Sequence, residues 1–327
     1  MTSIIVRTLL GFLLIVVEVK RRMKVGIAGT GAVGGYVGGM LSLAGHDVVF
    51  LTRGKSFEYL RNFGLVIETE NETKKVQGHF TNKIEDLSAV DLLVFTVKGN
   101  DTKEVAAKIQ PIIKKETVIL TLQNGVDNEE TLSDIFGYDR VLSAAAYIQV
   151  HIKEVGVVKQ IGGTPLFLIG SLDINKNEEF LKELHSFFNI ANLKTHISSN
   201  IMEVKWKKLL WNVTFNPLSA LIEKKVGVIL ENKDLLGIAR EICMESISVA
   251  KSLGLTIEED TVENVISQAQ QARDHQTSML QDKLKGKEME LESICGYIVN
   301  KGKHEKVPTP VLETIYRLLK FSQEKTN

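Results

Sequence analysis

The sequence predicts a protein of two parts, an α/β domain with a parallel sheet followed by an all-α domain. Short apolar runs alternate with segments of helical periodicity as far as Ser198, which is the pattern of repeated strand–helix–strand units. After Ser198 the apolar residues recur only at helical spacing, so we divide the chain into residues 23–198 and 199–327. The length of 327 residues and the hydrophobic fraction of 44% suit a globular chain of about two domains.

The charge balance indicates small molecules as partners. The 40 basic and 40 acidic residues cancel, so no excess of positive charge predicts binding to nucleic acid or to an anionic membrane. Cys243 and Cys295 form no C-x-x-C motif, and the seven histidines show no ligand spacing. We therefore predict a cytoplasmic protein without a metal site. The oligomeric state is left open, with a homodimer as one alternative.

Residues 1–22 form an apolar extension ahead of Met23. The uninterrupted apolar run at 9–17 is shorter than the about 20 residues that span a bilayer. It is similar to the apolar region of a signal peptide, but Lys-Arg-Arg at 20–22 stands where a cleavage site would follow. We interpret the extension as a non-native start upstream of Met23. A membrane anchor is the alternative if the extension is genuine.

A glycine-rich turn follows the first predicted strand. Residues 23–28 form a short apolar run, a helical pattern continues to Gly45, and 47–51 is the next strand. The turn between strand and helix consists of Gly29, Thr30, Gly31, Ala32, Val33 and Gly34. In a G-x-G-x-x-G turn the glycines permit a tight bend, close approach to a pyrophosphate and packing of helix on strand, and the helix N-terminus faces the phosphate. This context predicts a Rossmann-type dinucleotide-binding domain.

The end of the second strand indicates which dinucleotide binds. NAD-dependent enzymes place Asp or Glu there to bind the ribose 2′-hydroxyl. Residues 51–55 read Leu-Thr-Arg-Gly-Lys, with no carboxylate and two cations. Arg53 therefore suits the 2′-phosphate of NADPH, whereas Lys55 is either a second contact or a surface charge.

Two further strands end in polar residues. The strand at 91–97 precedes Lys98, and the strand at 117–122 precedes Asn124; a helix at 102–113 lies between them. Ligands of open α/β sheets bind at the carboxyl ends of strands, so we expect Lys98 and Asn124 where cofactor and substrate meet. For Asn124 the alternative is a simple turn with Gly125.

The remaining elements of the first part alternate in the same way. A helix is predicted at 177–188, and Gly162-Gly163-Thr164 is expected to join two strands as a hairpin. The other segments with strand character are residues 65–69, 75–80, 140–150, 155–161, 165–169 and 193–197.

The second part is predicted to be helical throughout. Residues 276–282 mix polar and apolar side chains without strong periodicity. Pro217 is expected to end or kink the first helix just past Asn216, because proline has no N–H and clashes with the preceding turn. The predicted helices are at residues 203–216, 234–253, 259–272, 288–301 and 310–322.

A narrow polar stripe runs along the first of these helices. Lys208, Asn212 and Asn216 recur at i, i+4 and i+8, so they share one helical face among bulky apolar side chains. Such a stripe faces a cleft or a satisfied internal network. The structural alternative is that the lysine extends to water and the two amides bind nearby backbone. In a cleft beside a dinucleotide, Lys208 can donate a proton to a ketone oxygen. With an ordinary lysine pKa of about 10.4 it would be charged and would stabilise a developing oxyanion.

Seven segments together resemble the ketopantoate reductase family. The resemblance runs in order from Met23 nearly to the C-terminus, and its segments at 208–218 and 278–282 are specific. It implies a 6-phosphogluconate dehydrogenase-like fold, in which an all-α domain follows the Rossmann-type domain. The segments are residues 29–34, Arg53, Val97-Lys98, Gln123-Asn124-Gly125, Lys208-x-x-x-Asn212-x-x-x-Asn216-Pro217-Leu218, Ser278-Met-Leu-Gln-Asp282 and Glu290.

The resemblance implies NADPH-dependent reduction of 2-dehydropantoate (ketopantoate) to (R)-pantoate, a step towards pantothenate and coenzyme A. Lys208 resembles the general acid, and Glu290 resembles the catalytic partner that holds this lysine. Asn212 and Asn216 resemble ligands of a substrate hydroxyl, and Ser278 resembles a ligand of the substrate carboxylate. Asn124 resembles a residue at the junction of substrate and nicotinamide. The implied cofactor contacts are Gly29, Thr30, Gly31, Ala32, Val33, Gly34, Arg53, Lys98 and Asn124.

The exact substrate is left open. Cys295-Gly296 stands where members of the family commonly have Asn-Gly, and Val226-Gly227 stands where some have asparagine. Paralogues with this scaffold reduce other 2-oxo acids, so an enzyme like the opine or hydroxy-acid dehydrogenases is the first alternative. A non-catalytic NADPH-binding sensor is the second, although its polar stripe would be expected to degrade and Lys208 is present.

Overall fold

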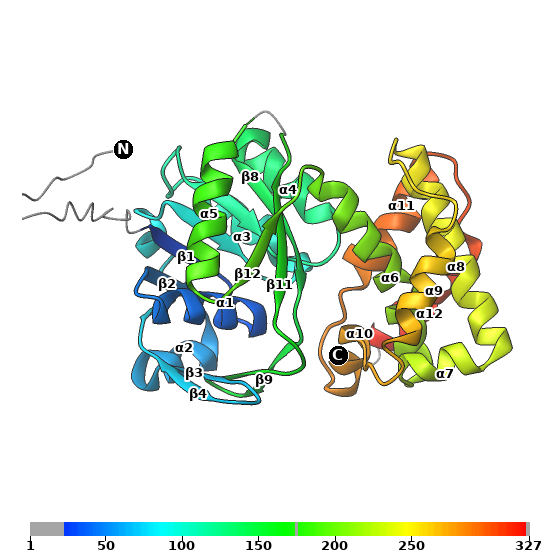
Figure 1. Ribbon diagram of the computed structural model, residues 1–327, viewed down its shortest axis with the longest axis horizontal. Coiled ribbons are helices and arrows are strands. Elements are labelled where there is room, and N and C mark those ends of the chain that lie inside the picture. The colour runs from blue at the N-terminus through cyan, green and yellow to red at the C-terminus, as the bar shows by residue number, and fades with distance from the viewer. Residues whose placement is uncertain (1–22, 174–175, 325–327) are drawn as a thin grey trace, which may run out of the picture.

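The computed structural model describes residues 23–173 and 176–324. Figure 1 shows an α/β part, coloured blue to green, beside a helical part, coloured yellow-green to red. This arrangement confirms the predicted fold class. The interpretation of residues 1–22 falls outside the described residues. The boundary at Ser198 stays a prediction.

The α/β part is built on an eight-stranded sheet in the order β12-β11-β8-β7-β6-β1-β2-β5. From β8 to β5 the paired strands are parallel, and β11 runs antiparallel to β8. The strands are β1 (Lys24–Ala28), β2 (Asp47–Leu51), β5 (His79–Thr81), β6 (Leu92–Phe95), β7 (Val118–Thr121), β8 (Val141–Tyr147), β11 (Leu166–Ser171) and β12 (Lys194–Ile197).

The strand order reverses at β1, which lies between β2 and β6. At the carboxyl end of β1, Ala28 is paired in register with Leu51 of β2 and with Phe95 of β6. The chain therefore leaves all three strands at the same edge of the sheet. This edge is the topological switch point, where open α/β sheets bind their ligands.

Helices cover both faces of the eight-stranded sheet (Figure 1). Helices α1 (Ala32–Leu43) and α5 (Glu178–Ile190) pack on one face, and α3 (Thr102–Ile109) and α4 (Asp127–Phe136) pack on the other. Strands covered on both faces are apolar along their whole length, and every residue of β6 is buried. Burial on both faces of the sheet explains the unbroken apolar runs of the sequence.

A second sheet has four strands in the order β4-β3-β10-β9. These are β3 (Leu65–Glu68), β4 (Thr73–Val76), β9 (Val150–Glu154) and β10 (Val157–Gln160), and helix α2 (Gly54–Phe63) precedes β3. The predicted hairpin at 162–164 is wrong, because β10 and β11 on either side of it lie in different sheets. The hairpin instead joins β9 to β10 at Gly156. Its φ of +80° lies in the left-handed region that favours glycine.

The helical part is organised around its first helix, α6 (Ile201–Ile222). Helices α8, α10 and α12 all pack against α6. Within the described residues, none of the helices has the length and apolar character needed to cross a membrane. The other helices are α7 (Val226–Glu231), α8 (Lys233–Ser252), α9 (Thr261–Gln270), α10 (Ser278–Leu284), the π-helical turn η4 (Glu292–Gly296), α11 (Tyr297–His304) and α12 (Pro310–Glu324).

Helix α6 does not end near Asn216 as the sequence predicts. Pro217 lies inside the helix, which continues to Ile222. The residues around Pro217 are buried on every side. Packing of this turn offsets the loss of one backbone hydrogen bond, so tertiary contacts outweigh the local preference of proline.

Two further helix predictions are corrected near the C-terminus. Residues 276–282 contain the start of α10, and the Thr277 side chain caps this helix by accepting a hydrogen bond from the N–H of Leu280. The helix predicted at 288–301 starts later, since Glu288 and Glu290 lie in an irregular segment ahead of η4. Glu290 is therefore held by a loop and not by a helix.

Close packing of α1 on the sheet predicts a sharp cost for one small substitution. A Cβ on Gly38 would lie 2.5 Å from the Phe50 ring and 2.7 Å from the Ile27 side chain. We expect Gly38→Ala to lower the free energy of unfolding by about 1–3 kcal/mol in urea titrations. The matched control is Gly237→Ala in α8, where a Cβ meets no atom within 4 Å; this change should stabilise by up to about 1 kcal/mol. Equal stability of both variants would contradict the packing.

Candidate functional site

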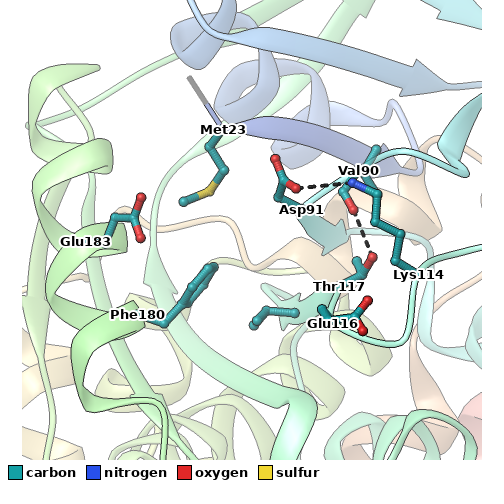
Figure 2. A pocket seen from close by; sticks show the side chains of 9 residues that line it. Met23, Val90, Asp91, Lys114, Glu116, Thr117, Phe180 and Glu183 are labelled. Atoms are coloured by element: carbon teal, nitrogen blue, oxygen red, sulfur yellow. Dashed lines mark hydrogen bonds and ion pairs between the residues drawn. The ribbon is translucent and has the colours of Figure 1, made fainter. Parts of the chain in front are cut away.

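A cavity of about 170 Å³ lies at the amino ends of β1, β6 and β7 (Figure 2). Two contacts join groups of its lining: Lys114 Nζ lies 3.3 Å from Asp91 Oδ1, and Thr117 Oγ1 donates to the carbonyl of Val90 at 2.8 Å. Ligands of open α/β sheets bind at the opposite, carboxyl ends of the strands. The functional site is therefore assigned to the switch-point edge and not to this cavity.

The glycine-rich turn at the switch point leaves space for a phosphate group. Gly29 has a φ of +105°, and a Cβ on Gly34 would lie 2.2 Å from the carbonyl oxygen of Gly29. A Cβ on Gly31 would meet no atom within 4 Å. Helix α1 starts at Ala32 without a side-chain cap, so its first N–H groups are available to an anion. The turn at 29–34 fits the pyrophosphate of a dinucleotide.

Two cations stand beside the turn, after the two strands that flank β1. Arg53 follows β2, its side chain is 84% exposed, and its guanidinium lies 2.8 Å from Asp101. Lys98 follows β6, and its ammonium lies 2.7 Å from Asp282 of α10. Burial lowers the pKa of Lys98, but Glu290, Asp282 and Glu288 outweigh this effect and raise it. Lys98 thus links the nucleotide edge to the helical part.

The ammonium of Lys208 reaches the same edge from α6. Its Nζ donates to Asn124 Oδ1 at 3.1 Å and to the carbonyl of Ala146 at 2.6 Å. It also lies 5.5 Å from the centre of the Tyr147 ring. Burial lowers the pKa of Lys208 to about 7; the nearby Lys205 adds to this effect, and Glu290 opposes it. The expectation of an ordinary lysine pKa is wrong, because this amine is desolvated.

Asn124 lies between Lys208 and Glu290. Its Oδ1 accepts from Lys208, and its Nδ2 donates to Glu290 Oε2 at 3.4 Å. Among the described residues, Glu290 reaches Lys208 through Asn124 and not through a hydrogen bond or ion pair of its own; its role as the partner that holds the lysine stays a prediction. Glu290 acts on the lysine through its charge and through the orientation of Asn124.

The other candidate residues on α6 are buried and point away from bulk water. Asn212 and Asn216 lie one and two turns beyond Lys208. In the part of the chain that the structure describes, Asn216 Oδ1 is buried without a hydrogen-bond partner. Ser278 is exposed at the first turn of α10, which packs against α6. Direct contacts unite Lys208, Asn124 and Glu290, whereas Ser278 joins this group only through the packing of α10.

A buried ion pair that the sequence did not predict lies behind Lys208. Lys205 Nζ lies 2.7 Å from Glu129 Oε1, and each side chain is 3% exposed. Gln123, next to Asn124, is also buried, and its Nε2 donates to Val97 O at 2.8 Å and to Thr102 Oγ1 at 2.7 Å. The only signal in the sequence was the i, i+3 spacing of Lys205 and Lys208, which is common on helices.

The fold and the site define a two-part α/β oxidoreductase, in which a Rossmann-type part faces a lysine from a helical part. Family models described as "Ketopantoate reductase PanE/ApbA" and "Ketopantoate reductase PanE/ApbA C terminal" match residues 25–173 and 200–323. The chain belongs to the ketopantoate reductase family and is an oxidoreductase of that family.

Relatives with known names support this assignment. The 2-dehydropantoate 2-reductase of Pyrococcus horikoshii is 34% identical over 92% of this chain and 98% of its own. The crystal structure of a PanE/ApbA family ketopantoate reductase from Ralstonia eutropha matches with a TM-score of 0.85 and 28% identity, over 93% of this chain and 99% of that one. A D-mandelate dehydrogenase solved with NADH and anilino(oxo)acetate has a TM-score of 0.86, with 23% identity over 93% and 100% of the chains. The last likeness shows a shared fold.

The lowered pKa of Lys208 predicts a pH-dependent cost to stability. The pKa of this amine is about 7 in the folded protein and about 10.4 in an unfolded chain. Between these values the unfolded state binds more protons, so the wild type loses stability as the pH falls from about 10 to about 7. We expect Lys208→Met to raise the free energy of unfolding by on the order of 2 kcal/mol at pH 6, with the gain vanishing towards pH 10.

Urea unfolding across this pH range measures the effect. Lys207→Met is the matched control, because Lys207 is exposed on the same helix and forms a surface pair with Glu203. A stability gain for Lys208→Met that does not change with pH would show that Lys208 titrates like an ordinary lysine.

Proposed function

We propose that the protein catalyses NADPH-dependent reduction of 2-dehydropantoate to (R)-pantoate in the cytoplasm, as a step of pantothenate and coenzyme A biosynthesis. One observation carries the proposal: a desolvated lysine amine with a pKa of about 7, bonded to Asn124, at the carboxyl edge of a dinucleotide-binding sheet. An amine that titrates near neutral pH is suited to give and regain a proton during turnover. The match to the P. horikoshii 2-dehydropantoate 2-reductase over nearly both chains supports this substrate.

NADPH is the proposed cofactor. When bound, the nicotinamide supplies a hydride to the ketone carbon. Gly29, Gly31 and the first N–H groups of α1 would bind the pyrophosphate. Arg53, whose guanidinium is exposed at the end of β2, would bind the 2′-phosphate. The D-mandelate dehydrogenase of the same fold was solved with NADH. The proposal of NADPH instead of NADH for this chain therefore rests on Arg53.

Lys208 is the proposed general acid. Its ammonium would donate a proton to the ketone oxygen as negative charge develops there. Glu290 favours the charged form of the amine, and Asn124 fixes its direction. A bound substrate carboxylate would favour the charged form further. Because the acid must be protonated, the rate of reduction should fall as the pH rises through the pKa of Lys208 in the complex.

The substrate would be held on both sides of Lys208. Asn212 and Asn216 lie further along the same face of α6, and the unpartnered Oδ1 of Asn216 can accept a bond from a substrate hydroxyl. Ser278 would bind the substrate carboxylate from the first turn of α10. Together these ligands suit a 2-oxo acid substrate that also carries a hydroxyl group.

The alternative is a reductase of another 2-oxo acid. It is favoured by the likeness to the D-mandelate dehydrogenase, which was solved with anilino(oxo)acetate, and by Cys295 at a position where asparagine is common in the family. A non-catalytic NADPH sensor is a weaker alternative, because Lys208, Asn124 and Glu290 are all present and in contact.

Assays of NADPH consumption distinguish these functions. We expect rapid oxidation with ketopantoate and slow oxidation with 2-oxo acids that lack the hydroxyl group, such as phenylglyoxylate. Lys208→Ala should lower kcat by about 10²–10⁴-fold, whereas Lys207→Ala should leave it unchanged. Faster turnover of a hydroxyl-free acid would favour the alternative reductase, and no turnover of any acid would favour the sensor.

The cofactor assignment has its own test. Arg53→Ala should raise the KM for NADPH about tenfold to a hundredfold, because the 2′-phosphate loses its cation, and should leave the KM for NADH unchanged. Arg61→Ala is the control, since Arg61 is exposed on the same helix α2 and packs over Phe57. Equal losses for NADPH and NADH would assign Arg53 to another part of the nucleotide.

A further inference from the structure

The ion pair of Lys205 and Glu129 joins the two parts of the molecule behind the proposed acid. Lys205 comes from α6, and Glu129 comes from α4. Lys205 Nζ lies 2.7 Å from Glu129 Oε1 and donates to the carbonyl of Gln123 at 2.8 Å. Ser143 Oγ of β8 donates to the same carboxylate oxygen at 2.5 Å. The pair is almost completely buried and therefore excluded from water.

Lys205 and Lys208, one helical turn apart, connect α6 to the same two strands. Lys205 reaches the residues after β7 at Gln123 O, and it reaches β8 through Glu129 and Ser143. Lys208 reaches the next residue after β7 at Asn124 Oδ1, and it reaches β8 at Ala146 O. The two lysines form parallel connections, but within the described part of the chain only Lys205 has a carboxylate within ion-pair distance.

We propose that Lys205 and Glu129 form a positioning device, a buried ion pair one turn from Lys208 that fixes α6 against the residues after β7 and against β8. The role deepens the proposed function and rests on it, because Lys208 is the acid that the device would place. Replacing a buried ion pair by neutral side chains commonly leaves a protein folded. The ion pair is therefore assigned to the geometry that it provides between α6, α4 and β8 and not to stability alone.

The charges around Lys208 allow this role. From its own helix it faces Lys205, from β8 the ring of Tyr147, and from the loop before η4 the carboxylate of Glu290. Helix α4 contributes Asp127 and Glu129, and both interact with Lys205. Among these groups, Lys205 lowers the pKa of Lys208 and Glu290 raises it. Removing the pair should therefore shift the pKa of Lys208 upwards.

The test removes both charges together in Lys205→Gln/Glu129→Gln, because one change alone would leave a buried unpaired charge. The glutamines keep polar groups for Gln123 O and Ser143, so the variant is expected to fold, which circular dichroism checks. Competitive acetylation with acetic anhydride, followed by mass spectrometry, gives the titration midpoint of Lys208 directly. We expect this midpoint to rise by roughly one pH unit.

Kinetics at pH 6 isolate the positioning role, since Lys208 is mostly protonated there in both proteins. The double variant should lose about tenfold in kcat through misplacement of α6, with an unchanged KM for NADPH. Lys207→Met is the control and should match the wild type in both measurements. A folded double variant with the wild-type midpoint and the wild-type kcat would overturn the proposal.

Labelling of the wild-type protein provides a second test of the device. Lys205 should stay unlabelled through the pH range in which Lys208 becomes reactive. Titration of Lys208 at the ordinary lysine value, or labelling of Lys205 together with Lys208, would also overturn the device. Because labelling needs no catalysis, a shifted midpoint in a protein that reduces no 2-oxo acid would support the device while refuting the proposed function.

Discussion

The contact of α6 with the ends of β7 and β8 is the interaction on which the rest of the structure depends. Helix α6 is the centre of the helical part, since α8, α10 and α12 pack against it. Fixing α6 therefore fixes Ser278 on α10 as well as Lys208. A shift of one residue along the helix would turn each side chain by about 100°. Lys208 would then lose both of its oxygen partners, so the register of this one contact determines the whole candidate site.

The same contact explains how an amine with a lowered pKa is maintained in the folded protein. Burial disfavours the charged form of Lys208, and the neighbouring Lys205 adds to this effect. Two oxygen acceptors and the charge of Glu290 offset part of the cost. The result is an amine near the middle of its titration at neutral pH, which favours proton transfer in either direction. A fully solvated lysine would be a weaker acid by about three pKa units.

The sequence predicted those features that depend on local patterns. The strand, the glycine-rich turn and α1 follow from spacing within one short segment, and the stripe of Lys208, Asn212 and Asn216 follows from helical periodicity. The hairpin at 162–164 was wrong because short apolar strands do not indicate which sheet they join. The end of α6 at Pro217 was wrong because burial of the surrounding turn overrides the preference of proline. Local patterns predict elements, and tertiary contacts decide their limits.

The electrostatics of the site could not be predicted for a related reason. Glu129 and Lys205 are far apart in the sequence, and each by itself is typical of a surface helix. Only the fold shows that they are 2.7 Å apart and excluded from water. The pKa of Lys208 depends on this burial, so a sequence motif could identify the residue and could not give its protonation state. Asn124 shows the same limit, because its position between Lys208 and Glu290 follows from a loop whose course has no sequence signature.

Under the proposed function, the buried side-chain oxygen of Asn216 would determine which 2-oxo acids the site accepts. Among the described residues this oxygen has no donor, and an unsatisfied buried acceptor costs about 1–3 kcal/mol. Under the proposed function, a substrate hydroxyl would satisfy it, and a 2-oxo acid without this hydroxyl would leave it unpaired in the closed site. A site built to bind a hydroxyl rejects analogues that lack it far more strongly than an apolar pocket rejects a missing methylene. Selection among 2-oxo acids would then arise from one amide on α6, two turns beyond Lys208, the proposed acid.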